Sequence, residues 1–472
     1  MAYIRKVIAP EEIRRQEAIC ASIAARLREQ GARPLAMVDT YGCQQNEADS
    51  EKLRGYLAEM GYGFTNDEFA ADVIVVNTCA VREHAEMRVL GNVGALNHTK
   101  KARPSQIIAV CGCMVQQEHM AEKIKKSYPI VDLVFGPHEL WRFPELLETV
   151  MEKGKRVFAA DKNDGAVAEG IPLRRDGKVK AWLSIMYGCN NFCTYCIVPY
   201  VRGRERSREP DAVIGEVRDL VARGYRDITL LGQNVNSYGR GCSFECDFTG
   251  LLRRADGIDG DFLLRFMTSH PKDATPELID AMAGGRHVAR QFHLPAQSGS
   301  DAVLRAMNRG YTREKYMDTL RLIKERIPGC VVSTDIIVGF PGETEADFED
   351  TLSLLREAGF DMVFSFIYSP RAGTPAATFG GAVDPATAGE RMQRLLELQT
   401  GISAEKNAAY KGREIRVLTC GRSRTDPSVT ECRTEGGKLL HIRETVPEGI
   451  FVKVKVTGTG AFVLEGELAE KI

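Results

Sequence analysis

The sequence GCNNFCTYC occupies residues 188–196 and directly follows an apolar, β-rich run at residues 181–187. Its cysteines, Cys189, Cys193 and Cys196, have the spacing C-x3-C-x2-C within one short loop. Three thiolates at this spacing can bind three irons of a [4Fe–4S] cubane and leave the fourth iron without a protein ligand. A structural zinc site would require a fourth Cys or His at a familiar spacing, and none follows nearby. The loop therefore predicts an iron–sulfur cluster with one open iron.

A regular alternation of strand-like and helical stretches continues from this loop. Apolar β-rich runs lie at residues 181–187, 227–231, 263–268, 288–294, 331–338 and 362–368. Helical patterns lie near residues 210–223, 275–284, 312–327, 344–358 and 384–410. This alternation is typical of parallel strands joined by helices. Because six strands are too few for a closed eight-stranded barrel, we predict an open, partial (β/α)6 barrel over residues 179–410.

The residues before the loop show the same alternation. Apolar β-rich runs lie at residues 35–41, 73–78, 107–111 and 133–135, and helical patterns near 46–60, 81–98, 116–127 and 138–152. We therefore predict an N-terminal parallel α/β domain over residues 34–152, preceded by a helical extension at residues 1–33. Residues 153–178 are rich in Lys, Asp, Gly and Ala, and we interpret them as a linker with one short strand at residues 156–159.

Further cysteines lie at the strand ends of this first domain. Cys43 follows the first predicted strand, Cys79 the second, and Cys111 and Cys113 the third. The carboxyl ends of parallel strands line one crevice, so these thiols are expected to meet although they are far apart in sequence. Cys113 is favoured over Cys111 as the third ligand because Gly112 lets the backbone approach a bulky cofactor. The sequence therefore predicts a second three-cysteine cluster with an open iron, and places Cys111 on the other side of its strand.

The last block, residues 411–472, has a different pattern. Short alternating strands are predicted at residues 414–419, 438–442 and 451–457, separated by glycine-containing turns. Short strands of this kind without intervening helices are typical of a small antiparallel β-barrel. The predicted fold class is thus α/β, with a β-barrel at its C-terminal end.

Composition restricts the possible partners and surroundings. The chain of 472 residues has 63 Lys and Arg against 64 Asp and Glu, so any nucleic-acid surface must be local. Its 13 cysteines, an odd number, fit metal-binding thiolates in a reducing cytoplasm better than a secreted disulfide scaffold. We find no apolar run near the ~18 residues of a membrane helix and no signal-peptide core. We therefore expect a cytoplasmic protein without membrane association.

Motifs along nearly the whole chain resemble those of the radical S-adenosylmethionine (SAM) methylthiotransferases. These motifs are TYGCQQNE at 40–47, NTCAVR at 77–82, GCM at 112–114, the loop at 188–196, VPYVRGRERSR at 198–208, HLPAQSGS at 293–300, DIIVGFPGET at 335–344 and YSPRAGTP at 368–375. The final barrel resembles a TRAM domain, which is an RNA-binding module. The GCM motif and FMTSHP at residues 266–271 favour the MiaB-type branch of the family.

The resemblance implies two [4Fe–4S] clusters, one on Cys43, Cys79 and Cys113 and one on the cysteines of the 188–196 loop. The loop cluster would cleave SAM to a 5′-deoxyadenosyl radical, and the other would carry the sulfur that a further SAM methylates. The implied product is a methylthio group on C2 of N6-isopentenyladenosine, next to the tRNA anticodon. The implied partners are the tRNA anticodon stem-loop, an electron donor and an iron–sulfur or sulfur-donor protein. We expect a monomer and no classical acid–base pair.

Contacts to SAM are expected in the cluster loop and at the strand ends of the second block. The candidates are Tyr195 beside the cluster, Gln233 and Asn234 for the amino group, Gln297 and Ser298 for the ribose, and Ile337 and Gly339 for the adenine. The alternative for each of these residues is turn formation or packing.

Arginines beside the cluster loop and in the barrel are the candidate RNA contacts. Arg202, Arg204 and Arg206 alternate with other residues, so an extended chain would present them together to phosphates. The alternative is a solvated loop with local ion pairs to Glu205 and Glu209. The barrel candidates are Arg413, Arg416, Arg422, Arg424 and Lys438.

Two other functions stay open at this point. A sibling methylthiotransferase would act on N6-threonylcarbamoyladenosine of tRNA or on an aspartate of a ribosomal protein. A protein of a different class would use the cysteines only to hold metal in a non-catalytic RNA-binding fold.

Overall fold

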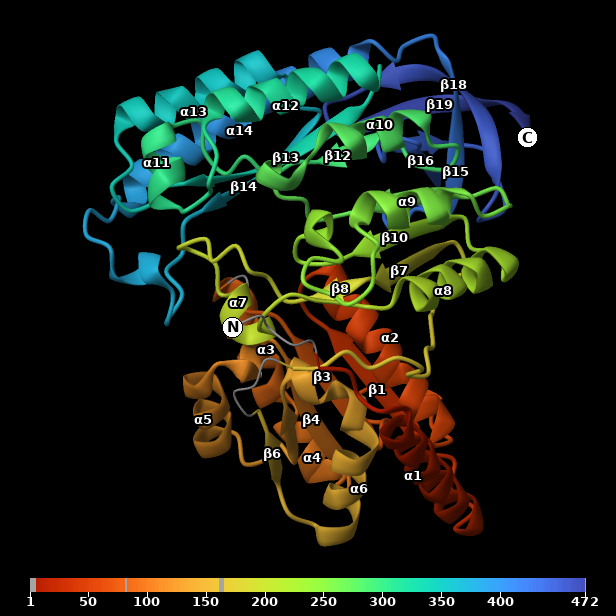
Figure 1. Cartoon of the computed structure of the whole chain (residues 1–472). Coiled ribbons are helices and arrows are strands. Elements are labelled where there is room, and N and C mark those ends of the chain that lie inside the picture. Colours follow the sequence, from red (N-terminus) through yellow and green to blue (C-terminus); the bar gives the residue numbers. More distant parts are fainter. Residues whose placement is uncertain (1–5, 81–82, 161–164, 472) are drawn as a thin grey trace.

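The computed structural model describes residues 6–80, 83–160 and 165–471. Figure 1 shows an N-terminal part at the bottom, a larger α/β part above it, and a small barrel beside the upper part. The order of helices and strands along the chain follows the predicted α/β class with a C-terminal barrel.

The N-terminal part is a six-stranded parallel sheet with the order β2-β1-β3-β4-β5-β6. Its strands are β1 (Leu35–Thr40), β2 (Gly63–Phe64), β3 (Val73–Thr78), β4 (Ile107–Gly112), β5 (Leu133–Phe135) and β6 (Val157–Ala159). Its helices are α1 (Pro10–Glu29), α2 (Gln44–Glu59), α3 (Glu83–Ala95), α4 (Asn97–Ala102), α5 (Glu118–Ser127) and α6 (Phe143–Lys153), with 3-10 turns η1 (Met114–Gln116) and η2 (Pro137–Arg142).

Alternate side chains of the central strands fill two separate cores. Val73 and Val75 of β3 pack with α2 and α6, whereas Ile74 and Val76 pack with α3 and α5. Both faces of the sheet are therefore buried, which explains the continuous apolar runs in its sequence. The prediction of parallel strands is confirmed, and β2 was missed because a two-residue strand carries no periodic pattern.

The upper part contains six parallel strands in two groups, with the orders β11-β10-β7 and β12-β13-β14. Its strands are β7 (Lys180–Ser184), β10 (Asp227–Leu231), β11 (Leu263–Phe266), β12 (Gln291–His293), β13 (Val331–Val338) and β14 (Met362–Ile367). A single parallel bridge between Leu264 and Val288 connects the two groups. The predicted six-stranded partial barrel is thus confirmed.

Helices cover the outer side of these strands (Figure 1). They are α8 (Pro210–Ala222), α9 (Phe248–Asp256), α10 (Pro276–Gly284), α11 (Asp301–Ala306), α12 (Arg313–Arg326), α13 (Glu345–Ala358) and α14 (Pro385–Ala408), with 3-10 turns η3 (Val235–Ser237), η4 (Pro271–Asp273) and η5 (Pro375–Thr378). The ends of α13 illustrate how the sequence sets them. Thr344 and Asp347 form a reciprocal capping box at its start, and Gly359 ends it in the left-handed conformation.

The C-terminal barrel is closed, with the strand order β15-β16-β17-β19-β18. Its strands are β15 (Glu414–Arg422), β16 (Thr430–Thr434), β17 (Leu439–Ile442), β18 (Phe451–Thr459) and β19 (Val463–Lys471). The expectation of a purely antiparallel barrel is wrong in one pair, because β17 and β19 run parallel. Strands β16 and β19 were not among the predicted strands.

The segment interpreted as a linker is packed against both larger parts where the structure describes it. Val167 forms a bridge with Val7. Arg175 is buried and lies 3.1 Å from a Glu51 carboxylate oxygen of α2 and 2.7 Å from one of Glu216 on α8. The segment therefore fastens the N-terminal part to the upper part. In the described ranges no helix is long and apolar enough to cross a membrane.

A buried ionic cluster joins the barrel to the upper part. The Nζ atom of Lys438 lies 2.9 Å from Asp361 Oδ1, and both side chains are only 7% exposed. Lys438 also donates to Asn407 Oδ1 at 2.9 Å, and Lys406 Nζ lies 3.1 Å from the second Asp361 oxygen. Removing one member of such a cluster leaves a buried charge with fewer partners.

We predict that Lys438→Met lowers the free energy of unfolding by about 3 kcal/mol. This value is at the low end for a broken buried pair, because Lys406 still lies next to Asp361. The urea midpoint of unfolding measures the effect. The control is Glu435→Gln, which disrupts a half-exposed pair with Arg290 at 3.8 Å across the same interface and should cost less than about 1 kcal/mol. Equal shifts for the two variants would contradict the structural role of Lys438.

Candidate active site: two cysteine triads at one interface

The first triad lies at the carboxyl edge of the N-terminal sheet. Cys79 directly follows β3 and Cys113 directly follows β4, while Cys43 lies three residues beyond β1 and precedes α2. Because β1, β3 and β4 are neighbours in the sheet, their ends are adjacent and bring the three cysteines together. We call Cys43, Cys79 and Cys113 the N-terminal triad.

The thiols of the N-terminal triad influence one another. A hydrogen bond with Cys79 lowers the pKa of Cys43 to about 6, an effect that burial opposes and the charge of Arg202 assists. Burial raises the pKa of Cys113 to about 11, with Arg202 lowering and Cys43 raising it further. Cys43 keeps an exposed surface, whereas Cys79 and Cys113 are buried. The triad therefore combines mutual proximity with one side open to incoming groups.

Cys111 and Cys113 lie in different surroundings because β4 ends at Gly112, whose positive φ turns the chain before Cys113. Strand alternation alone would place residues two apart on the same side, so the sequence-based reason for separating the two thiols was wrong. Cys111 is buried in the core between the sheet and α2, where burial raises its pKa well above the usual value. Cys113 instead packs with Ala80, Ile197 and Val201. Only Cys113 of the two lies with Cys43, which agrees with the choice made from sequence.

Two glycines let the backbone pass close to these thiols. A Cβ atom at Gly42 would lie 2.4 Å from the Cβ of Cys79. Gly112 has φ of 96°, and a Cβ there would lie 2.3 Å from the carbonyl oxygen of Thr78. A side chain at either position would displace a cysteine-bearing turn.

Sequence reasoning missed Asn46, which ties the strand ends together. Its Nδ2 atom donates to the carbonyl oxygens of Thr78 at 2.8 Å and Tyr41 at 3.1 Å. Asn77 Nδ2 donates in return to the Asn46 carbonyl oxygen at 2.9 Å. Both asparagines lie within the quoted motifs, but only the fold shows that they lock two cysteine-bearing turns.

The second triad, Cys189, Cys193 and Cys196, occupies the loop after β8 (Met186–Tyr187); we call it the loop triad. The loop is closed by hydrogen bonds from Cys189 N to Gly203 O at 3.1 Å and from Cys196 N to Cys193 O at 3.0 Å. Burial, aided by neighbouring thiols, raises the pKa of Cys196 to about 12. A bound metal would offset this burial by stabilising the thiolates.

Both triads fit a cubane cluster better than a single metal ion. Each offers three sulfur donors, and a cubane takes each thiolate on a different iron. In the part of the chain with described placement, no three or more His, Cys, Asp or Glu side chains surround one position for a single ion. The fit therefore rests on the donor set, on the close approach of backbone to thiol that Gly42 and Gly112 permit, and on two arginines. Arg202 donates to Cys113 Sγ of the N-terminal triad, and Arg309 donates to Cys193 Sγ of the loop triad.

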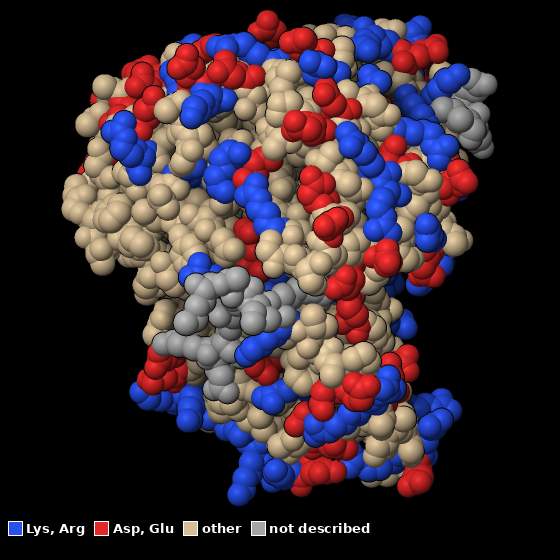
Figure 2. Space-filling model, viewed as in Figure 1, with Lys and Arg blue, Asp and Glu red and all other residues tan. Residues whose placement is uncertain are grey.

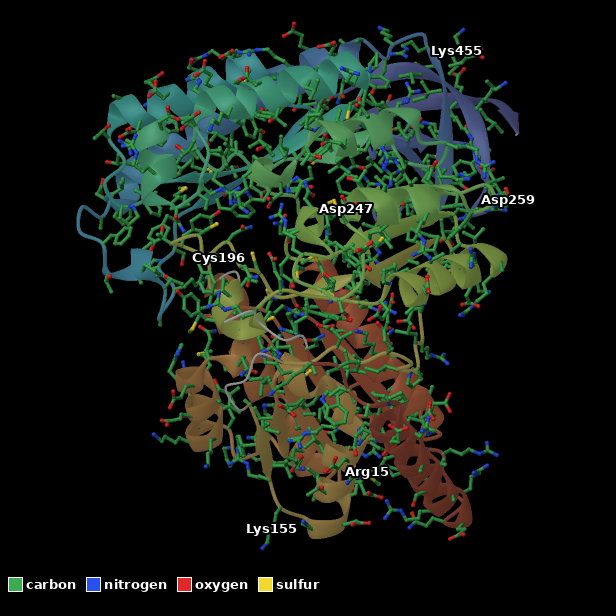
Figure 3. All side chains as sticks on the ribbon, in the orientation of Figure 1. Arg15, Lys155, Cys196, Asp247, Asp259 and Lys455 are labelled. Atoms are coloured by element: carbon green, nitrogen blue, oxygen red, sulfur yellow. The ribbon has the colours of Figure 1, made fainter. Side chains whose placement is uncertain are left out.

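The two triads meet where the N-terminal part joins the upper part. The short helix α7 (Val198–Arg202) begins two residues after Cys196, and its Arg202 donates from Nε to Cys113 Sγ at 3.1 Å. Figure 3 shows Cys196 between the two parts of the molecule. One helix of five residues thus separates the loop triad from the N-terminal triad.

Three of the predicted SAM contacts lie near the loop triad or line one apolar cluster, and a fourth, Gln297, lies beyond the end of β12 beside β13. Gln233 Oε1 accepts a hydrogen bond of 2.5 Å from Gly188 N, directly before Cys189. Tyr195 and Ile337 pack against the same buried cluster around Phe340. The backbone of Gln297, at φ of 72°, forms a bridge with β13.

The other three predicted SAM contacts use their polar groups within the protein. Asn234 Nδ2 donates to Asp273 at 2.8 Å. Ser298 Oγ lies 3.2 Å from Thr351 Oγ1. Gly339, at φ of 75°, donates its backbone N–H to Glu343 at 3.0 Å.

The predicted row of RNA-binding arginines beside the loop triad is wrong in its geometry. Arg202 ends α7 instead of lying on an extended chain, and it is buried against Asp49 at 2.8 Å. Arg206 is also buried, and it donates to the carbonyl oxygens of Arg202 and Arg204. Only Arg204 of the three is exposed, with its guanidinium 4.5 Å from the ring centre of Phe192.

The barrel arginines remain exposed, and the lysine does not. Arg413, Arg416, Arg422 and Arg424 lie on the surface. Arg416 also pairs with Asp261 of the upper part and stacks on Phe451, 3.6 Å from its ring centre. The expectation that Lys438 contacts RNA is wrong, because Asp361 and Asn407 hold its ammonium group in the interior.

Comparison with known proteins places the two parts in known families. A model of the radical SAM superfamily matches residues 183–355, and one described as uncharacterized protein family UPF0004 matches residues 36–136. A radical SAM methyltransferase, TsrM from Kitasatospora setae, has a similar fold, with a TM-score of 0.53 over 73% of this chain and 74% of that chain at 15% identity. The fold and the loop triad thus define a protein of the radical SAM class.

Full-length relatives identify the branch of this class. The tRNA-2-methylthio-N(6)-dimethylallyladenosine synthase of Thermoanaerobacter sp. (strain X514) is 46% identical and covers 98% of both chains. The enzyme of the same name from Clostridium botulinum (strain Langeland) is 50% identical over 91% of this chain and 96% of its own length. The chain belongs to the tRNA-2-methylthio-N(6)-dimethylallyladenosine synthase family.

We predict that Gly112→Ala disrupts the N-terminal triad. Backbone strain alone costs about 1–3 kcal/mol, and the clash with Thr78 displaces Cys113. Iron content after anaerobic reconstitution should fall, and urea unfolding should shift to lower concentration. The matched control is Gly91→Ala in the exposed part of α3, where nothing lies within 4 Å of an added Cβ. Alanine in a helix should there raise the free energy of unfolding by about 0.5–1 kcal/mol. A full iron complement in Gly112→Ala would refute this account of the turn.

Proposed function

We propose that this chain is a radical SAM methylthiotransferase that adds a methylthio group to C2 of N6-isopentenyladenosine next to the anticodon of tRNA. The observation that carries the proposal is the meeting of two three-cysteine sites at one interface in a member of this family. A single radical SAM cluster would need only the loop triad. The N-terminal triad beside it is suited to deliver a second group to the same substrate.

Each triad holds one [4Fe–4S] cluster in this proposal, and the loop triad's cluster also binds SAM. When bound, these groups supply the radical and sulfur chemistry, which no side chain of the protein can perform. The chain itself provides position and exclusion of water. Residues 34–152 carry the N-terminal triad, residues 179–410 carry the loop triad, and residues 411–472 contribute to RNA binding.

The surroundings of the loop triad suggest how SAM is held. Tyr195 and Ile337 supply an apolar wall, while Gln233 and Gln297 place polar groups at two strand ends. Gly339, at the turn after β13, is the further adenine contact of this proposal. Asn234 and Ser298 position the neighbouring turns through Asp273 and Thr351.

The remaining partners follow from the chemistry of the proposed reaction. Reductive cleavage of SAM requires an electron donor, and renewal of the transferred sulfur requires an iron–sulfur or sulfur-donor protein. Both triads and the barrel belong to one chain, so a monomer suffices for the reaction. The thiolate sites suit a reducing cytoplasm.

In this proposal RNA approaches the loop triad over a partly exposed aromatic platform. It consists of Phe192, Tyr200 and Arg204, and the rings of Phe192 and Tyr200 meet edge-on with centroids 6.1 Å apart. Phe192 has φ of 47°, a strained conformation for a non-glycine residue, and Tyr200 is 46% exposed. Single-stranded loops of RNA bind by stacking unpaired bases on aromatic rings and guanidinium planes.

This local platform agrees with the charge distribution. Figure 2 shows Lys and Arg interspersed with Asp and Glu over the visible face, without one broad basic field. Stacking beside the loop triad, together with Arg413, Arg416 and Arg422 of the barrel as phosphate contacts, suits a stem-loop.

We expect the anaerobically reconstituted chain, given reductant and SAM, to convert N6-isopentenyladenosine in tRNA to its 2-methylthio derivative. Mass spectrometry of tRNA nucleosides measures the product. Cys79→Ala should reduce iron from about eight to about four atoms per chain and abolish methylthiolation while keeping release of 5′-deoxyadenosine.

The matched control for Cys79→Ala is Cys111→Ala, which removes a neighbouring buried thiol outside the triad and should keep both clusters. A methylthio product on threonylcarbamoyladenosine or on a ribosomal protein would favour a sibling function. Zinc in place of iron, with no turnover of SAM, would favour the non-catalytic RNA-binding protein and overturn the proposal.

We expect Tyr200→Ala to weaken binding of the anticodon stem-loop by about 1–3 kcal/mol, the usual worth of one stacked base. Arg204→Ala should also weaken binding and reduce the slope of log affinity against log salt by about one. Fluorescence anisotropy with a labelled stem-loop measures both. The control is Arg223→Ala, which removes an exposed arginine over Tyr225 at the end of α8. Equal losses for Arg204→Ala and Arg223→Ala would speak against the platform.

A further inference from the structure

Each cysteine triad has one buried arginine that donates a hydrogen bond to one of its sulfurs. Arg202 Nε lies 3.1 Å from Cys113 Sγ, and an Arg309 NH group lies 3.3 Å from Cys193 Sγ. The two arginines are only 5% and 4% exposed. A guanidinium group is always charged, so burying it requires negative or strongly polar partners.

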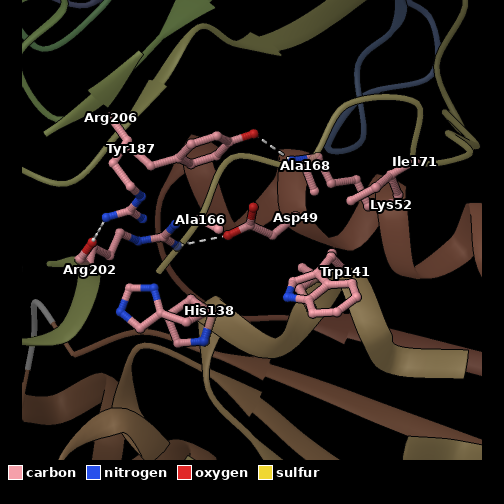
Figure 4. A pocket seen from close by; sticks show the side chains of 12 residues that line it. Asp49, Lys52, His138, Trp141, Ala166, Ala168, Ile171, Tyr187, Arg202 and Arg206 are labelled. Carbon is pink, nitrogen blue, oxygen red and sulfur yellow. Dashed lines mark hydrogen bonds and ion pairs between the residues drawn. The ribbon is translucent and has the colours of Figure 1, made fainter. Parts of the chain in front are cut away.

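Arg202 is held by the N-terminal part although it belongs to α7. Besides Cys113, it contacts Asp49 Oδ2 at 2.8 Å and Asn46 Oδ1 at 3.2 Å. Figure 4 shows Arg202 and Asp49 facing each other in the pocket between the two parts, near the pair of Lys52 and Tyr187. A helix that starts beside the loop triad is therefore anchored on a ligand of the other triad.

Arg309 has a different set of partners. Its remaining hydrogen bonds go to Pro295 O at 2.9 Å, Tyr311 Oη at 2.9 Å and Tyr195 Oη at 3.4 Å. Among the ion pairs of the described residues none includes Arg309. The Cys193 sulfur is thus the one partner of Arg309 that belongs to the loop triad.

We propose that Arg202 and Arg309 are positioning residues that raise the reduction potentials of the two clusters, one arginine for each cluster. The inference rests on the proposed two-cluster function. One-electron reduction makes a cluster more negative, and a cation or N–H donor at a ligand sulfur stabilises that reduced state. Arg202 in addition fixes the distance between the triads, because α7 carries it from one to the other.

Asp49 allows a test based on the direction in which the reduction potential shifts. Its carboxylate balances Arg202, and it lies close enough to influence the pKa of Cys113. Removing the cation of Arg202 makes reduction harder, whereas removing the anion of Asp49 makes it easier. Simple structural damage would not produce opposite shifts.

The experiment is an EPR-monitored redox titration of full-length chains that hold one cluster each. A Cys189→Ala, Cys193→Ala, Cys196→Ala background keeps the N-terminal triad, and a Cys43→Ala, Cys79→Ala, Cys113→Ala background keeps the loop triad. In the first background Arg202→Gln should shift the midpoint to more negative potential, Arg202→Lys by less, and Asp49→Asn to more positive potential. In the second background Arg309→Gln should shift the midpoint negatively and Arg202→Gln should not.

The matched control is Arg175→Gln, which breaks another buried arginine pairing across the same interface, with Glu51 and Glu216. It should leave both midpoints unchanged. If Arg202→Gln fails to hold iron, Arg202→Lys and Asp49→Asn still test the inference, because they should shift the midpoint potential in opposite directions.

Unchanged midpoints, or shifts of the same sign for Arg202→Lys and Asp49→Asn, would overturn this inference while leaving the two-cluster function intact. Failure of the parent backgrounds to bind any iron–sulfur cluster would instead overturn the proposed function.

Discussion

The carboxyl ends of parallel strands lie on one edge of a sheet, and the site depends on this constraint. It brings Cys43, Cys79 and Cys113 together from three neighbouring strand ends, although 36 and 34 residues separate them in the chain. Hydrogen bonds of Asn46 across two of these ends make the arrangement rigid. A site built on strand ends is more precise than one on free loops, which suits a site that binds a rigid cofactor.

Buried charges at the interfaces fix how the parts of the molecule sit together. Arg202 with Asp49 and Lys438 with Asp361 each span two parts, and Arg175 of the connecting segment joins Glu51 of one part to Glu216 of the other. Such pairs add little net stability because desolvation offsets their attraction, but a misaligned pair leaves an uncompensated buried charge. Their contribution is therefore to geometry: any shift between the parts that separated the triads would also break an ion pair.

Much of the fold and of the cysteine sites could be predicted from sequence, because both depend on local or periodic signals. Cys189, Cys193 and Cys196 lie in one short loop, and Gly112, which turns the chain at the end of β4, favours Cys113 over Cys111. The strands β2, β16 and β19 were missed because short or mixed sequences give no clear period. The parallel closure of the barrel by β17 and β19 depends on long-range pairing that no local pattern encodes.

The arginines after the loop triad were predicted wrongly, because their exposure depends on the backbone conformation and on the packing around them. Alternation of Arg202, Arg204 and Arg206 places them on one side only if the backbone is extended, but Pro199 near the start of α7 favours a helix there. Burial then changes what the charge contacts: an exposed arginine is free to attract phosphate, whereas a buried one must find negative or polar partners inside the protein. The described partners of Arg202 are Asp49, Asn46 and the sulfur of Cys113. The same residue type is thus exposed at Arg204 and buried against Cys113 and Asp49 at Arg202, and only the three-dimensional structure distinguishes the two.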